Sequence, residues 1–67
     1  MAITLRAARI NKGLTQKEAA ILLKVSEESL SNYENGKTYP TVPLLKRIEK
    51  VYGIGYNDLF FLPEDTL

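Results

Sequence analysis

The chain has no cysteine and no histidine. Without cysteine it can form neither a disulfide nor a thiolate metal site, and without histidine it lacks the commonest zinc ligand and the usual general base. Metal-assisted and nucleophile-base chemistry therefore have little support in the composition. We expect no cofactor, no metal and no enzymatic activity.

A long apolar run is also absent. No stretch approaches the roughly 20 residues that a membrane-spanning helix needs. The apolar stretch at residues 1–10 contains Arg6 and Arg9, which is unlike a signal peptide. We therefore expect a soluble, cytoplasmic protein with no membrane partner.

Charge of either sign is not in large excess, because nine Lys and Arg against eight Asp and Glu give a net charge of +1. Residues 1–40 hold six basic and four acidic residues, whereas residues 41–67 hold three and four. This asymmetry is a weak indication of nucleic-acid binding. Few phosphate contacts would then form per copy, which favours a homodimer on two half-sites. With 67 residues the chain is expected to be one domain, residues 1–67, because its core is too small to divide.

What the sequence does contain is a pair of short helices around a tight corner. Residues 15–18 read Thr-Gln-Lys-Glu, a capping box whose hydroxyl and carboxylate each accept a backbone hydrogen bond and start a helix. Ser26 offers a second N-cap, and only Lys24 and Val25 lie between it and the expected end of that helix. Helices over 16–23 and 27–34 must then cross steeply, as in a helix-turn-helix, and polar residues on the outer face of the second helix indicate a nucleic-acid reader.

Capping and turn signals predict an all-α domain of five helices, over about residues 5–12, 16–23, 27–34, 42–52 and 56–61. Apolar residues at helical spacing are expected to form the core, and they are Leu5, Ala8, Ala19, Ala20, Leu22, Leu23, Leu30, Tyr33, Leu45, Ile48, Val51, Tyr52, Leu59 and Phe60. Phe61 and Leu62 exceed what a small fifth helix needs, so they are candidates for a dimer contact. Residues 63–67 are expected to fray.

Three strings of residues carry a resemblance to a known family. They are K-G-L-T-Q-K-E-A-A at 12–20, L-K-V-S at 23–26 and Y-E-N-G-K-T-Y-P at 33–40. On these strings the run from residue 5 to residue 60 resembles the lambda-repressor-like DNA-binding domains of the phage repressor and Cro group, also called the xenobiotic-response-element family. The resemblance implies a five-helix domain with a helix-turn-helix at about 16–35, which binds double-stranded DNA and regulates transcription, as a repressor.

The resemblance also implies roles for particular residues. In the family, the helix that begins near Ser26 reads bases, while residues matching Gln16, Asn35 and Lys37 contact phosphates. The complete set of residues expected to contact DNA is Thr15, Gln16, Lys17, Ser26, Glu27, Glu28, Ser29, Ser31, Asn32, Asn35 and Lys37. Arg9 and Glu34 fall where the family often has a structural ion pair between the first helix and the end of the third.

Some positions leave more than one interpretation open. Glu27 and Glu28 lie where family members read bases, and a carboxylate there can accept from cytosine N4 although phosphates repel it. Alternatively, both acids only stabilise the helix start through the helix dipole. Asn32 is the preferred base reader, because Asn can bond adenine bidentately. Lys24 stands where the family usually has a glycine with positive φ, so we expect this corner to be wound differently.

Two other functions stay open at this stage. The first is an antitoxin-like or protein-interaction module in which the helix-turn-helix is auxiliary. The second is an enzyme-associated fragment, because many members of the family that it resembles carry a second domain for cleavage or ligand sensing.

Overall fold

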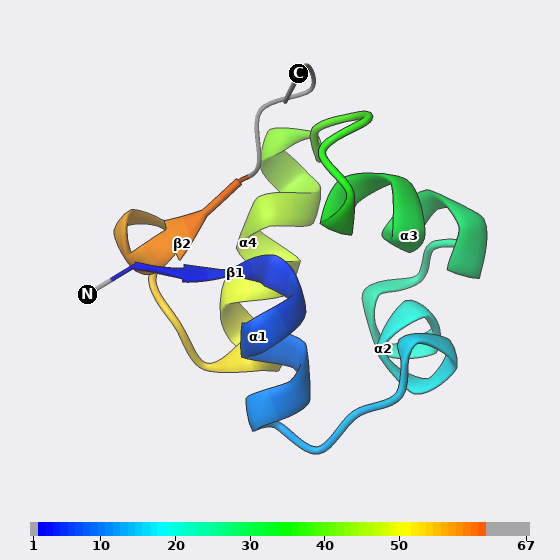
Figure 1. Cartoon of the computed structure of the whole chain (residues 1–67), viewed down its shortest axis with the longest axis horizontal. Helices are drawn as coiled ribbons and strands as arrows, with labels where there is room; N and C mark the ends of the chain where they lie inside the picture. The colour runs from blue at the N-terminus through cyan, green and yellow to red at the C-terminus, as the bar shows by residue number, and fades with distance from the viewer. Residues whose placement is uncertain (1, 62–67) are drawn as a thin grey trace.

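The computed structural model describes residues 2–61. Four α-helices make up most of it: α1 (Leu5–Asn11), α2 (Gln16–Leu23), α3 (Glu27–Glu34) and α4 (Val42–Tyr52). The 3-10 helix η1 (Tyr56–Asp58) follows, and the strands β1 (Ile3–Thr4) and β2 (Leu59–Phe60) lie at the two ends of the described part. α2 and α3 lie together on one side and the strand pair on the other, with α1 and α4 between them (Figure 1). No helix among the described residues is long and apolar enough to cross a bilayer.

Each of the four helices begins at a hydroxyl side chain that caps it. The hydroxyls of Thr4, Thr15, Ser26 and Thr41 accept hydrogen bonds from the backbone N–H groups three residues ahead. These contacts satisfy donors that a helix cannot pair internally, and each contributes about 1 kcal/mol. All four helix starts therefore fall where the sequence predicts them.

The end of the described chain differs from the expectation of a fifth α-helix over 56–61. One 3-10 turn forms there, and Leu59–Phe60 then continues as a strand that pairs in parallel with β1, Ile3 opposite Leu59. Leu and Phe in succession suit a strand, where neighbouring side chains point to opposite faces. Leu59 accordingly faces the core at 8% exposure, whereas Phe60 faces outward at 49%. The expected burial of Phe60 is wrong.

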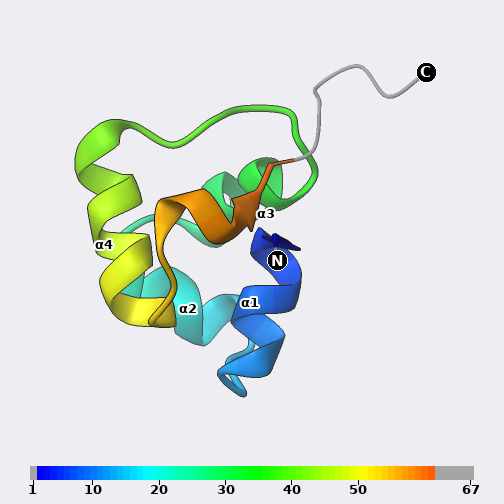
Figure 2. The ribbon, with the colours of Figure 1, turned by 90° about the vertical axis from the view of Figure 1, so that its left-hand side faces the viewer.

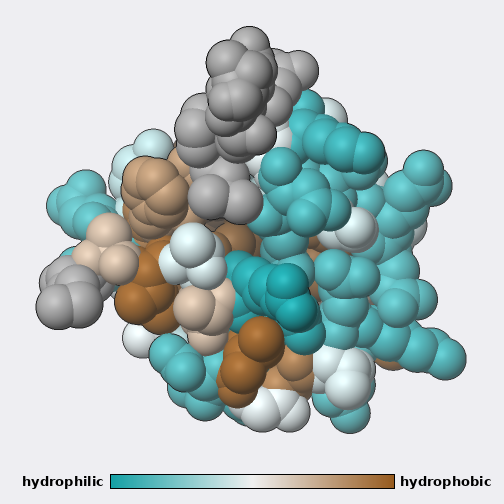
Figure 3. Space-filling model, viewed as in Figure 1, coloured by the Kyte–Doolittle hydropathy of each residue, from teal (hydrophilic) through white to brown (hydrophobic). Residues whose placement is uncertain are grey.

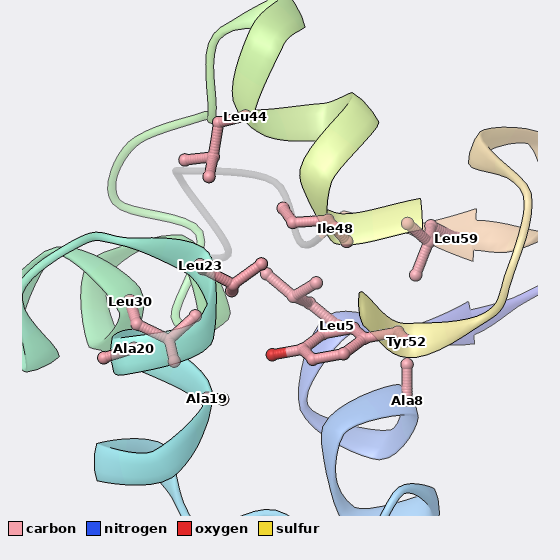
Figure 4. Packing of buried hydrophobic residues seen from close by; sticks show 10 residues of the cluster. All are labelled: Leu5, Ala8, Ala19, Ala20, Leu23, Leu30, Leu44, Ile48, Tyr52 and Leu59. Atoms are coloured by element: carbon pink, nitrogen blue, oxygen red, sulfur yellow. The ribbon is translucent and has the colours of Figure 1, made fainter. Parts of the chain in front are cut away.

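The core is built from one face of every helix and from β2. Its buried members, all labelled in Figure 4, are Leu5, Ala8, Ala19, Ala20, Leu23, Leu30, Leu44, Ile48, Tyr52 and Leu59. Leu5, Leu23, Leu30 and Ile48 are the largest side chains with almost no exposed surface. Small alanines on α2 let α3 approach closely, so the steep helix pair sits directly on the core.

Two expected core positions are shifted by one residue. On α4 the buried side chain is Leu44, which lies four and eight residues before Ile48 and Tyr52, while Leu45 is only half-buried against the core. On α2 Leu22 is 50% exposed, although its neighbour Leu23 is fully buried. Adjacent residues of a helix point about 100° apart. In each of these two pairs, one leucine therefore faces the centre of the core and its neighbour points toward the edge of the core or into solvent.

Candidate nucleic-acid interface

The corner between α2 and α3 is formed by a lysine in a conformation that favours glycine. Lys24 has φ 62° and ψ 42°, and its N–H and that of Val25 both return to carbonyls of α2. This left-handed conformation costs a lysine on the order of 1 kcal/mol. The Arg47 guanidinium of α4 donates to the Leu23 carbonyl at 3.0 Å, which ties the corner to α4. The expectation that the corner is wound differently is wrong, because tertiary contacts hold Lys24 in the usual geometry.

The outer face of α3 is polar and begins with two exposed acids, Glu27 and Glu28. The Ser26 hydroxyl accepts the Ser29 N–H and donates to the Ser29 hydroxyl, both at 3.0 Å, so these two serines are already bonded to each other. Asn32 lies one turn after Glu28 on the same face of the helix and is partly exposed. The side chains most available to a ligand on this face are therefore the two acids and Asn32.

The turn after α3 lies next to this face. Gly36 is buried with φ 78°, a conformation that only glycine adopts without strain, and the Lys37 N–H donates to the Asn32 carbonyl at 2.9 Å. The Asn35 amide donates to the Ser31 hydroxyl at 3.3 Å, so in this structure it bonds to α3. The Lys37 side chain is exposed, which leaves a cation at the end of the polar face.

The start of α2 adds a second exposed cation, Lys17, and the side-chain amide of Gln16, which a hydrogen bond holds in place. Thr15 and Glu18 form the complete capping box, with bonds of 3.1 and 2.9 Å, and Lys17 is exposed beside them. The Gln16 amide nitrogen donates to the Glu34 carboxylate at 3.1 Å. One amide hydrogen and the amide oxygen of Gln16 are left for another partner.

A buried ion pair fixes α3 relative to α1. Arg9 Nε donates to Glu34 Oε2 at 2.8 Å and Nη2 to Oε1 at 3.3 Å, while Nη1 donates to the Leu14 carbonyl at 2.9 Å. The side chains of Arg9 and Glu34 are 11% and 4% exposed. Because Gln16 bonds to the same carboxylate, Glu34 joins α1, α2 and α3 at one point.

The hydroxyl of Tyr52 lies near this ion pair without a hydrogen-bond partner in the described part of the chain. Burial and, to a smaller extent, the Glu34 carboxylate together raise the pKa of Tyr52 to about 12, although the positive charge of Arg9 opposes the effect. A buried hydroxyl without a partner costs stability. One buried hydrogen-bonding group beside the ion pair is thus left without a partner among the described residues, and this lowers the stability of the core.

The polar residues described above gather on one side of the molecule. Figure 3 shows hydrophilic side chains over the side on which α2 and α3 lie, with apolar residues mostly on the opposite side. Lys17 at the start of α2 and Lys37 in the turn after α3 are exposed, as are Glu27 and Glu28 on α3. This side therefore combines exposed cations with the polar outer face of α3.

Of the two expected dimer residues only Phe61 lies within the described part, and Leu62 lies outside it. Phe61 is half-buried against the core. Its ring lies 6.4 Å from that of Tyr39 and 6.2 Å from that of Tyr56. Phe61 is thus a member of an aromatic cluster rather than an isolated exposed residue.

Two capped helices that meet at a tight corner, pack on the core through their inner faces and carry polar residues on the outer face of the second helix define the class of the molecule as a helix-turn-helix protein. The helix-turn-helix family model matches residues 5–59, and the chain belongs to this family.

Relatives with curated names are similar over most of the chain. It is 38% identical over 55 residues to the HTH-type transcriptional activator BcrR of Enterococcus faecalis, covering 82% of this chain and 27% of that protein. It is 34% identical over 56 residues to the HTH-type transcriptional regulator PuuR of Escherichia coli K12, covering 84% of this chain and 30% of that protein. An uncharacterized HTH-type transcriptional regulator of Archaeoglobus fulgidus is 31% identical over 67 residues, which are 100% of this chain and 96% of that protein. The chain thus spans less than a third of the first two relatives and nearly all of the third.

Proposed function

We propose that this chain binds double-stranded DNA sequence-specifically and regulates transcription, with α3 in the major groove. The observation that carries the proposal is the capped helix pair, whose polar outer face is held in place by the buried ion pair of Glu34 with Arg9 and by the bond from Gln16 to Glu34. Relatives named transcriptional regulators support it. A cytoplasmic homodimer acting as a repressor is the form we favour, because a domain bound over a promoter blocks it without contacting the polymerase.

The proposed contacts divide into two kinds. Gln16, Lys17 and Lys37 contact phosphates from the two ends of the polar face, and such contacts fix position but carry no sequence information. Asn32 reads a base from α3, since its amide can both donate to and accept from adenine. Further proposed contacts are Thr15, Ser26, Ser29, Ser31 and Asn35. Each side chain forms a hydrogen bond within the protein that a DNA contact would have to share or replace.

Replacing Gln16 or Lys37 with alanine should weaken binding to cognate and scrambled duplexes equally, by about 1 kcal/mol for one lost hydrogen bond. Only the Lys37 change removes a charge, so it alone should reduce the slope of log affinity against log salt by about 1. Asn32→Ala should instead reduce discrimination at one base pair by about 1–3 kcal/mol. Fluorescence anisotropy titrations at several salt concentrations measure both quantities.

Lys12→Ala is a matched control, because Lys12 is exposed at the end of α1 and belongs to no proposed contact. It should leave the affinity nearly unchanged. A Gln16 variant that lost only its preference for the cognate duplex would show that Gln16 reads a base instead. Absence of binding to every duplex from a random pool would overturn the proposed function as a whole.

Glu27→Gln and Glu28→Gln test whether either acid reads a base. If one accepts from cytosine N4, its replacement should raise affinity for scrambled duplexes, because phosphate repulsion is removed, and lower the cognate preference by about 1–3 kcal/mol at one base pair. If both acids only stabilise the start of α3, affinity should rise alike on every duplex. Helix stability should then fall by about 0.3–1 kcal/mol.

These outcomes have opposite signs on the cognate duplex, so titrations of each variant on cognate and single-base-substituted duplexes separate them. A thermal melt of each variant measures the stability term independently. Equal gains on all duplexes for both variants would end the base-reading hypothesis and leave DNA binding itself intact.

A further inference from the structure

A hollow of about 400 Å³ on the outer surface of α4 is lined mostly by cations. Its lining residues, which we call the α4 basic hollow, are Pro43, Lys46, Arg47 and Lys50. No acidic residue of the described chain lines it. The whole chain has a net charge of only +1, so three positive charges around one hollow are a strong local excess. Such a concentration of charge of one sign attracts anions.

The α4 basic hollow is open to a partner. The face of α4 that packs on the core runs through Leu44, Ile48 and Tyr52. Successive residues of a helix point about 100° apart, so Lys46 and Lys50 lie on the opposite face, and both are exposed. In Figure 2 α4 forms the left edge of the molecule, with α1, α2 and α3 to its right. The other helices of the described chain therefore leave the outer face of α4 uncovered.

The fold accounts for only part of this charge. Lys50 lies in the last turn of α4, where a cation complements the helix dipole. Lys46 lies one turn earlier, and like charges four residues apart on a helix repel each other and destabilise it. Neither lysine forms an ion pair with another residue in the range 2–61. An anion in the hollow would offset this repulsion, so the arrangement favours a bound ligand of negative charge.

Arg47 is the fixed cation of the hollow. Its side chain is half-buried, and Nη1 donates to the Leu23 carbonyl at 3.0 Å. A guanidinium has five N–H donors in a planar fork, so most of them remain for another partner. That fork matches the two oxygens of a carboxylate. Because the end of α2 already holds the guanidinium, binding a carboxylate costs less side-chain freedom than it would at a freely rotating arginine.

We propose that the α4 basic hollow binds an acidic segment of another protein in an extended conformation. Lys46 and Lys50 are separated by a rise of about 6 Å along α4. Alternate side chains of an extended chain lie on one side of it with a spacing of about 6.6 Å. Two carboxylates placed two residues apart in such a segment therefore reach Lys46 and Lys50 together, while a third pairs with Arg47. This partner goes beyond the proposed DNA binding and does not depend on it.

DNA phosphates are the other anions that suit such a hollow, but its position favours a protein. Arg47 bonds to Leu23, the last residue of α2, whereas Gln16, a proposed phosphate contact, is the first. These two ends are about 10 Å apart along the helix axis. The hollow thus lies beside the end of α2 that is farther from the proposed phosphate contacts of Gln16 and Lys17. A duplex bound through the start of α2 need not cover the hollow, which stays available to a protein partner.

Fluorescence anisotropy with a labelled peptide of glutamates only tests the hollow. The wild-type chain should bind this probe, and the double variant Lys46→Gln with Lys50→Gln should bind it about fivefold more weakly, because two charge pairs are lost. Arg6→Gln with Lys12→Gln is the matched control, since both residues are exposed on or next to α1 and their replacement removes the same total charge. The control should lose less than about twofold, because charges far from the hollow are screened. Thermal melts of both double variants should show that the fold persists.

Two further measurements locate the bound probe. In an NMR titration of the isotope-labelled chain with the same peptide, the largest backbone shifts should fall on residues 43–50 and on Leu23, whose carbonyl Arg47 contacts. On a duplex of random sequence the two double variants should bind with equal affinity and equal salt dependence, because neither pair of residues is a proposed phosphate contact.

A wild-type chain that does not bind the probe, a Lys46 and Lys50 variant that binds it as well as the control does, or shifts centred on α3 would each overturn the proposal. A Lys46 and Lys50 variant that binds the duplex more weakly than the control, with a salt slope lower by about 2, would also overturn it, since the hollow would then contact DNA phosphates. Probe binding at the hollow by a chain that binds no duplex would overturn the proposed function and leave this inference standing.

Discussion

Leu30→Ala should lower the free energy of unfolding by about 2–5 kcal/mol, because the leucine side chain is completely buried where α3 packs on α2. The alanines at positions 19 and 20 already let the two helices touch, so the helices cannot move closer to fill the space. Small domains have a total stability of about 5–15 kcal/mol. One truncation would thus remove a large part of it.

Urea unfolding followed by circular dichroism measures this loss, and two further variants calibrate it. Leu45→Ala should cost clearly less than Leu30→Ala, because Leu45 is only half-buried. Ile21→Ala, at a residue that is 68% exposed, should change stability by no more than about 0.5 kcal/mol. Equal losses at Leu30 and Leu45 would mean that the orientation of α4 is wrong.

Local signals in the sequence predict the parts of the fold that depend on neighbouring residues. Each helix start is a hydroxyl followed three residues later by the N–H that it accepts, as at Thr4 and Thr41. Such a contact is complete within four residues, so the sequence alone contains it. The four helices and the tight corner follow from these contacts.

Features that depend on distant residues are less predictable. The strand over Leu59–Phe60 exists because it pairs with Ile3–Thr4 at the other end of the described chain, and apolar residues in a short run suit a helix or a strand equally well. Which of the two leucines, Leu44 or Leu45, is buried in the core likewise depends on where α4 meets the other helices. Lys24 adopts the left-handed conformation although lysine disfavours it, and the bond from Arg47 to the corner comes from 24 residues away along the chain.

The same distinction applies to the candidate site. A resemblance between sequences identifies Gln16 and Asn35 as candidate phosphate contacts, but it does not show their present partners. Gln16 bonds to Glu34, which is 18 residues away, and Asn35 bonds to Ser31 on the preceding turn. A DNA contact by either residue therefore has to compete with, or be oriented by, a bond already present in the protein.

Glu34→Ala should cost about 3–5 kcal/mol of unfolding free energy, among the largest effects of any single change in this chain. The change removes the carboxylate from a pair whose side chains are 11% and 4% exposed, so the charge of Arg9 would be left buried without its partner. Arg9 would keep only its bond to the Leu14 carbonyl. Gln16 would lose the acceptor of its amide as well.

The double variant Arg9→Met with Glu34→Leu is the informative control, because it removes both charges and fills their volume with apolar atoms. Replacing a whole buried ion pair in this way is often neutral or stabilising, so the double variant should be more stable than Glu34→Ala. Urea unfolding of the single and double variants measures the coupling between the two residues. Losses below about 1 kcal/mol that simply add would show that solvent screens the pair. A different result is expected if the two residues are strongly coupled and the double variant recovers its stability. If its DNA affinity nevertheless falls, Glu34 also orients Gln16 for the proposed phosphate contact.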